Sequence, residues 1–94
     1  MNEQINNCIN NNKFVILFFY SDSCEHCIEM EKKITTNFGY IEMIRINIEK
    51  EKGLAEKYSV LYIPTIIVLK DREIISIIVG SQDCIEYLNK IFML

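Results

Sequence analysis

The sequence predicts an α/β fold in which helices cover both faces of a mixed four-stranded sheet. A strand–helix–strand succession over residues 14–48 predicts a parallel pair of strands, because such crossovers join parallel neighbours. Two β-branched runs, Thr65–Leu69 and Ile74–Val79, are separated by four polar residues and predict an antiparallel hairpin. Phe14–Tyr20 and Thr65–Leu69 are apolar throughout, which is typical of central strands buried on both faces.

Four helices are predicted by apolar residues that recur three and four positions apart. Gly39 is expected to end the second helix as its C-cap. Ser81 is expected to cap the first turn of the last helix with its hydroxyl. The core-facing residues are expected to be Ile5, Cys8 and Ile9 in a helix over 3–11, Cys27, Met30, Ile34 and Phe38 in one starting at Cys24, Leu54, Ala55 and Tyr58 in one over 51–58, and Ile85, Leu88 and Phe92 in the last.

The remaining strand and the hairpin turn complete the order of elements. Residues 41–48 alternate between apolar and polar side chains, which predicts a strand with one buried face. Lys70–Glu73 is expected to form the turn of the hairpin, although it lacks the preferred Asn-Gly pair. The predicted order is therefore α-β-α-β-α-β-β-α.

Size and composition restrict the class of protein. The chain has 94 residues, 50% of them hydrophobic and 24% charged, so residues 1–94 are expected to form a single domain. A net charge of −3 argues against nucleic acid as a partner, and the apolar runs are too short to span a membrane. Residues 1–7 contain neither a basic leader nor an apolar segment, so we expect a cytoplasmic location.

A pair of cysteines, Cys24 and Cys27, lies where the first strand gives way to a helix. Two thiols on the first turn of a helix can close into a disulfide and reopen, and the helix N-terminus stabilises a thiolate there. In a chain with four cysteines such a pair is a moderate signal, and its place after a buried strand strengthens it. In the cytoplasm this pattern favours catalysis or metal binding over a structural disulfide.

Taken together, these features resemble the thioredoxin family over nearly the whole chain. The shared marks are the Cys24-x-x-Cys27 motif, Asn47–Glu49 at a strand end, Tyr58–Thr65, and Val79-Gly80 after the hairpin. The resemblance implies a thioredoxin-like fold and a thiol–disulfide oxidoreductase active in cell redox homeostasis. Its substrates would be protein disulfides, its electron donor a reductase or a small thiol, and its redox centre the cysteine pair without any further cofactor.

The chain also departs from the family pattern. The family's first strand has no counterpart, since the sequence begins at the first helix. Ser23 replaces the usual tryptophan, and Glu25-His26 replaces Gly-Pro between the cysteines. Phe18 stands six residues before Cys24, where thioredoxins often carry a buried aspartate that serves proton transfer.

The two cysteines are expected to play different roles. Cys24, at the helix start, is the predicted nucleophile, and Cys27, on the apolar face, is the predicted resolving thiol. A cationic His26 would stabilise the Cys24 thiolate, and protein disulfide isomerases also carry a histidine before the second cysteine. Glu25 would oppose this weakly, and His26 could instead be a solvated turn residue.

A substrate surface is expected beside the thiols. In the family, the proline that matches Pro64 is cis and lies against the disulfide, so the resemblance implies the same of Pro64. Tyr20, Tyr62 and Ile63 would flank the thiols and offer an extended peptide a small apolar surface, although both tyrosines could be ordinary surface aromatics.

Three alternatives remain open from the sequence. The chain could be a non-catalytic thioredoxin-like binding domain that uses the Pro64 surface, or a glutathione-linked reductase, since Gly80–Asp83 faintly resembles a glutaredoxin motif. Cys24, His26 and Cys27 could bind zinc, but no second ligand pair completes a tetrahedral set, so no metal is expected. Cys8 and Cys84 are expected to pack in the core of a monomer.

Overall fold

The computed structural model describes residues 2–93 and contains the elements that the sequence predicts, in the predicted order. Their ends differ from the predicted ends by at most one residue. The elements are α1 (Asn2–Asn11), β1 (Phe14–Tyr20), α2 (Glu25–Phe38), β2 (Glu42–Asn47), α3 (Lys52–Lys57), β3 (Thr65–Lys70), β4 (Glu73–Val79) and α4 (Ser81–Phe92).

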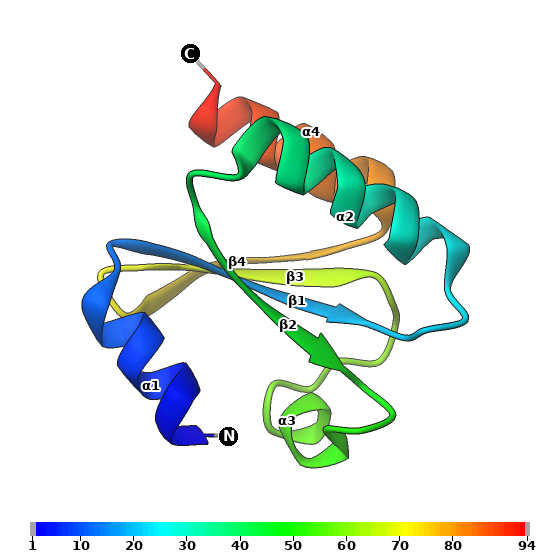
Figure 1. Ribbon diagram of the computed structural model, residues 1–94, viewed down its shortest axis with the longest axis horizontal. Coiled ribbons are helices and arrows are strands. Elements are labelled where there is room, and N and C mark those ends of the chain that lie inside the picture. Colours follow the sequence, from blue (N-terminus) through cyan, green and yellow to red (C-terminus); the bar gives the residue numbers. More distant parts are fainter. Residues whose placement is uncertain (1, 94) are drawn as a thin grey trace.

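The four strands form one mixed sheet in the order β2-β1-β3-β4. β1 runs parallel to β2 and antiparallel to β3, and β3 and β4 form the antiparallel hairpin. Helices α2 and α4 lie side by side on one face of the sheet, and α1 and α3 lie on the other (Figure 1). The predicted fold class is confirmed, and so is the central position of β1 and β3.

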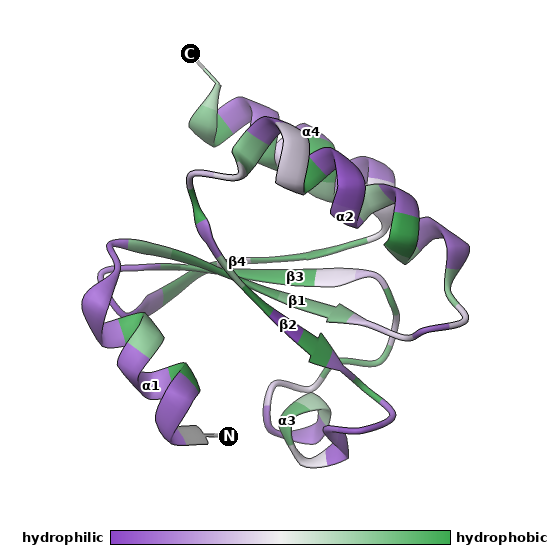
Figure 2. Cartoon of the chain, in the orientation of Figure 1, coloured by the Kyte–Doolittle hydropathy of each residue, from purple (hydrophilic) through white to green (hydrophobic). Residues whose placement is uncertain are grey.

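Each face of the sheet carries its own hydrophobic core, and the two central strands supply both. Alternate residues of β1 and β3 point to opposite faces, so β1 is apolar along its length and β3 is apolar from Ile66 to Leu69 (Figure 2). The core under α2 and α4 includes Ile16, Phe18, Cys27, Met30, Phe38, Ile66 and Leu88, and the core under α1 and α3 includes Ile5, Val15, Leu17, Phe19, Leu54 and Ile67.

One helix end differs from the sequence prediction, and a second confirms the predicted C-cap for a different physical reason. Gly80, not Ser81, occupies the N-cap of α4, and no side chain caps that helix end. The φ of Gly80 is 93°, a value that glycine adopts without steric cost, so the chain turns there from β4 into α4. Gly39 does sit at the C-cap of α2, but with a right-handed φ of −62°. A Cβ there would lie 2.6 Å from the Thr35 carbonyl oxygen, so glycine is required by space and not by a positive φ.

The hairpin turn reaches the expected geometry with unusual residues. Asp71 and Arg72 have φ values of 49° and 74°, the positive values that a two-residue type I′ turn requires. The amide of Asp71 donates a hydrogen bond of 2.7 Å to the carbonyl oxygen of Lys13, which helps to hold the turn. The β3–β4 register shifts between Val68 and Leu69, whose partners are Ser76 and Ile74, so Ile75 is an extra, bulged residue.

Two glycine-to-alanine substitutions should change stability in opposite directions. Gly39→Ala should lower the free energy of unfolding by about 1–3 kcal/mol, because the Thr35 backbone would have to move. Gly53→Ala should raise it by about 0.5–1 kcal/mol, because Gly53 lies in α3 and a Cβ there meets nothing within 4 Å. Chemical denaturation of the three proteins would measure both effects, and a loss of stability in Gly53→Ala would contradict the argument.

Candidate functional site

The cysteine pair lies at the end of the most buried strand. β1 ends at Tyr20, and Cys24 occupies the N-cap position of α2 with an extended backbone. Cys24 and Cys27 form a disulfide, with 5.2 Å between their Cα atoms. The amide of Cys24 donates a 3.3 Å hydrogen bond to the carbonyl oxygen of Ser21, which closes the short turn between strand and helix. The sequence therefore placed the pair correctly at the junction of β1 and α2.

The two sulfurs have different surroundings. Cys24 is partly exposed, whereas Cys27 is only 2% exposed and belongs to the core under α2 and α4. The Cys27 amide donates a hydrogen bond of 3.2 Å to the sulfur of Cys24. The Cys27 amide, in the first turn of α2, therefore faces the Cys24 sulfur, where it would stabilise a negative charge.

Hydrocarbon surrounds Cys27 on the inner side of the site. Phe18 is fully buried in the same core cluster as Cys27 and Met30. Across residues 2–93, the buried polar side chains are those of Ser21, Asn47 and Thr65, and none of them is a carboxylate. The core therefore offers Cys27 no internal acid or base, as the phenylalanine at position 18 implies.

The second loop that the sequence analysis assigns to the site contains Pro64. The Ile63–Pro64 peptide bond is cis. The Pro64 carbonyl oxygen accepts a 2.9 Å hydrogen bond from the Gly80 amide, and Thr65 donates one of 2.5 Å from its Oγ1 to the carbonyl oxygen of Tyr62. Ile63 is partly buried against both hydrophobic cores, so the loop is anchored at the start of the central strand β3.

The two candidate tyrosines differ in their environment. Tyr20 is partly buried and stacks on Phe18, with 5.5 Å between ring centroids, while the Arg45 guanidinium lies 4.9 Å from the centroid of the Tyr20 ring. Tyr62 is largely exposed on the Pro64 loop. Tyr62 is therefore free to meet a partner, whereas Tyr20 is held by packing.

Glu25 and His26 form the first turn of α2 between the cysteines. Both side chains are exposed, so their charges would act on Cys24 through water and would be screened. A cationic His26 would therefore act on the Cys24 sulfur in the opposite direction to the Glu25 carboxylate.

The other two cysteines are free thiols. Cys84 is fully buried in α4, its sulfur donates to the Ile78 carbonyl oxygen at 3.4 Å, and burial raises its pKa to about 12. Cys8 is partly exposed, and burial, together with the charge of Glu42, raises the pKa of its thiol. Packing in the core therefore explains the presence of a cysteine at position 84 fully and at position 8 in part.

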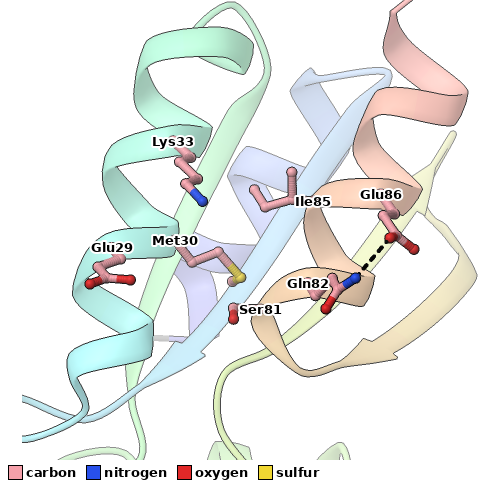
Figure 3. A pocket seen from close by; sticks show the side chains of 7 residues that line it. All are labelled: Glu29, Met30, Lys33, Ser81, Gln82, Ile85 and Glu86. Carbon is pink, nitrogen blue, oxygen red and sulfur yellow. Dashed lines mark hydrogen bonds between the residues drawn. The ribbon is translucent and has the colours of Figure 1, made fainter.

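A groove between α2 and α4 begins one helical turn beyond Cys27. It has a volume of about 300 Å³, and Gln82 donates a 3.2 Å hydrogen bond to Glu86 along one wall (Figure 3). Carboxylates outnumber ammonium groups on its walls, which disfavours an acidic ligand. The lining residues are Glu29, Met30, Lys33, Ser81, Gln82, Ile85 and Glu86.

Neither a metal-binding cluster nor a membrane-spanning helix is found in the described part of the chain. Residues 2–93 contain no group of three or more histidine, cysteine or acidic side chains placed to hold a metal ion. None of the helices described is long and apolar enough to cross a membrane.

Sequence reasoning missed two features of the site. One is the role of Gly80, whose amide ties the end of β4 to the Pro64 loop, and its place just before a helix was the available signal. The other is a group of exposed apolar residues on β4. The signal was a strand, Ile74–Val79, that lacks the alternation of polar and apolar residues typical of a sheet edge.

The fold and this site define a small α/β protein with a disulfide-forming pair at a helix start, and comparison with known proteins gives its family. The thioredoxin family model matches residues 1–91. A thioredoxin from Streptomyces clavuligerus is 33% identical over 73 residues, covering 74% of this chain and 68% of that protein. Thioredoxin 2 from Plasmodium falciparum is 30% identical over 86 residues, covering 84% of this chain and 55% of that protein.

Solved structures agree on the fold. A mutant thioredoxin from Halobacterium salinarum superposes with a TM-score of 0.82 at 22% identity, covering 98% of this chain and 86% of that chain. Trxlp from Edwardsiella tarda gives 0.81 at 14% identity, covering 94% of this chain and 93% of that chain. The chain belongs to the thioredoxin family, whose members are oxidoreductases that work through a redox-active disulfide and need no further cofactor. It spans about half the length of several curated relatives that it matches.

The free cysteines should differ in reactivity towards a thiol-alkylating reagent. With the Cys24–Cys27 disulfide intact, Cys84 should stay unmodified from pH 7 to 9, because its raised pKa keeps it a buried thiol throughout. Cys8 should react, and faster as the pH rises, because it is partly exposed and only the thiolate is nucleophilic. Mass spectrometry of the folded protein would measure this, with the denatured protein as the control in which both react. Labelling of Cys84 in the folded state would contradict the prediction.

Proposed function

We propose that this protein is a thiol–disulfide oxidoreductase that exchanges electrons between its Cys24–Cys27 pair and disulfides of other proteins. The observation that supports this most is the asymmetry of the pair. The Cys24 sulfur is partly exposed and accepts a hydrogen bond from the Cys27 amide, whereas Cys27 is buried behind it. One thiol is therefore suited to attack a partner, and the other to resolve the complex.

The reaction balances without a further group in the protein. The Cys24 thiolate attacks one sulfur of a substrate disulfide, and the other sulfur leaves as a thiolate with the bonding electron pair. Cys27, as a thiolate, then attacks the Cys24 sulfur and releases the second substrate thiolate. Two electrons pass to the substrate, and a dithiol reductase or a small thiol must reduce the protein again.

The Pro64 loop is proposed as the docking surface for the substrate chain. Its backbone is fixed by the Gly80 amide and by Ile63, and Tyr62 is exposed beside it. We expect the loop to contact the sulfur of Cys24 or Cys27. Tyr20 would contribute only the exposed edge of its ring, since its face stacks on Phe18.

Two other interpretations of the site are less well supported. A non-catalytic binding domain has no need of two thiols that differ so much in burial. A glutathione-linked reductase would have to bind the two carboxylates of that tripeptide, and the groove beside Gly80–Asp83 carries Glu29 and Glu86. A thioredoxin-like exchange with protein disulfides therefore remains the proposal.

The proposal includes the setting in which the protein works. We propose that it acts as a single-domain monomer in cell redox homeostasis, in a reducing compartment such as the cytoplasm. Two free thiols, Cys8 and Cys84, support a reducing environment, because oxidising compartments favour paired cysteines.

Single cysteine substitutions test the two roles. Cys24→Ser should abolish dithiol-driven reduction of a protein disulfide, a loss of at least about a thousandfold, because serine is a far weaker nucleophile. Cys27→Ser should accumulate a mixed disulfide between Cys24 and the substrate, visible on a non-reducing gel. Cys84→Ala serves as a matched control that should retain activity. Full activity of Cys24→Ser would refute the proposed function.

Charge substitutions between the cysteines test the modulating residues. His26→Ala should raise the pKa of Cys24 in the reduced protein, and Glu25→Ala should lower it, because a nearby cation favours the thiolate and an anion opposes it. A less stable thiolate makes the disulfide less oxidising. The equilibrium constant with glutathione should change by no more than about tenfold, because both side chains are exposed and their charges are screened by water. Thiolate absorbance against pH measures the shifts. Identical curves for all three proteins would leave His26 as a solvated turn residue.

A further inference from the structure

Apolar side chains are exposed along one face of β4, outside the cysteine pair and the Pro64 loop. Ile74, Ile77 and Val79 are 48%, 57% and 45% exposed. Ile77 pairs with Ile67 and Ile74 pairs with Leu69, so these side chains share the face that carries α1 and α3. The core under α1 and α3 is built from α1, β1, β2, α3 and β3, and β4 contributes none of its buried residues. Exposed apolar residues gathered on one face mark an interaction surface.

This surface is continuous with the Pro64 loop. Val79 pairs directly with Thr65, and the next residue, Gly80, donates its amide to Pro64. On the same side of the sheet, Val60 packs against the core under α1 and α3, and the two residues after it are exposed. We call Ile74, Ile77 and Val79 the apolar strip; its Val79 end adjoins the Pro64 loop, where Leu61 and Tyr62 are exposed.

The length of the strip matches a short segment of extended chain. Val79 and Ile74 are five residues apart along β4, a distance of about 17 Å in a strand. An extended partner segment of about five residues would cover this length, and its Val79 end would lie beside the Pro64 loop.

The strip and the opposite side of the site differ in charge. Residues 74–79 contain no charged side chain. On the other side of Cys24, Asp22, Glu25 and Glu29 are exposed at the start of α2. A partner chain that crosses the site would therefore meet hydrocarbon on one side of its cysteine and carboxylates on the other.

Pairing between the β4 edges of two copies would be hindered by the strand itself. Ile75 is bulged and has no partner on β3. A bulge twists an edge strand and interrupts the regular hydrogen bonding that a second strand would need. The bulge therefore favours recognition through the side chains of the strip over addition of a second copy.

We propose that the apolar strip binds an extended, aliphatic segment that flanks the reactive cysteine of the protein substrate. This inference rests on the proposed function, which it deepens by naming the kind of substrate. The strip would select disulfides whose cysteine has an apolar flank on one side and no acidic flank on the other.

Chromogenic peptides test the preference. Each probe is a peptide whose single cysteine forms a mixed disulfide with thionitrobenzoate. The apolar probe carries five leucine and valine residues next to the cysteine, and the polar probe carries five serine and asparagine residues there. Each flank is tested once on the N-terminal side of the cysteine and once on the C-terminal side. Cys24 attacks the peptide sulfur, thionitrobenzoate leaves, and Cys27 then releases the peptide thiol. The reduced protein should react about tenfold faster with the apolar peptide, in one orientation of the flank.

The double variant Ile74→Thr/Ile77→Thr should lose this preference and keep its rate with the polar peptide. Threonine keeps the β-branched shape that suits a strand, and both positions are half exposed, so the fold should persist. Met93→Ser is the matched control, because Met93 is 51% exposed at the far end of α4. It should retain the wild-type preference.

The possible outcomes separate the inference from the function on which it rests. Equal rates of the wild type with both peptides, or an unchanged preference in the double variant, would overturn the inference alone. If the reduced protein reacts neither with any peptide nor with the symmetric disulfide of thionitrobenzoate, the proposed function is overturned as well. A dimer in sedimentation experiments that the double variant dissociates would assign the strip to a second copy and overturn the substrate assignment.

Discussion

Burial of β1 on both faces is the constraint on which the rest of the structure depends. Its residues from Val15 to Phe19 are all buried and alternate between the two hydrophobic cores. A strand held in this way can neither slide nor tilt without exposing one core or the other. Its end at Tyr20 therefore fixes the turn that follows and, through it, the start of α2. The position of the Cys24 sulfur follows from packing in the strand that precedes it.

The same constraint separates the two thiols. Because α2 begins immediately after Cys24, the helical period carries Cys27 back onto the sheet, beside Phe18. Burial against hydrocarbon disfavours an anion at Cys27, whereas the helix amides favour one at Cys24. One turn of helix therefore gives two chemically identical groups opposite preferences. The asymmetry needs no additional charged residue in the core.

The sequence predicted the elements and their order well because two periodicities dominate it. The unbroken apolar runs of β1 and β3 indicate central strands, and the helical spacing of Cys27, Met30 and Ile34 indicates the buried face of α2. The helix ends were less predictable, because they depend on local space. Gly39 is required by the Thr35 carbonyl oxygen, and Gly80 replaces Ser81 at a cap because the chain must turn with a positive φ.

The sequence predicted the parts of the candidate site that lie within its motifs, but not the contacts between segments. The cysteine pair and Pro64 lie in segments far apart in the sequence, and the family resemblance supplied their association. The contact between Gly80 and Pro64 joins residues on two strands of a hairpin, so no local pattern reveals it. The apolar residues of β4 were visible in the sequence, but whether they were covered depended on how far α1 and α3 extend over the sheet.

The departures from the family pattern have a common physical consequence. Phe18 removes an ionisable group from the inner side of Cys27, so the protons that Cys27 exchanges must cross the outer side of the site. His26 and Glu25 are exposed on that outer side, and the proposed substrate would dock there. A partner segment lying over Cys24 would exclude water from the path by which Cys27 loses its proton. Under the proposed function, resolution of the mixed disulfide would therefore depend on how the partner is held, and docking of its flank on β4 would leave the start of α2 open to water. The apolar strip and the phenylalanine at position 18 would in this sense be complementary: a substrate flank bound on β4 would leave the helix start accessible to solvent, and Phe18 makes that access necessary.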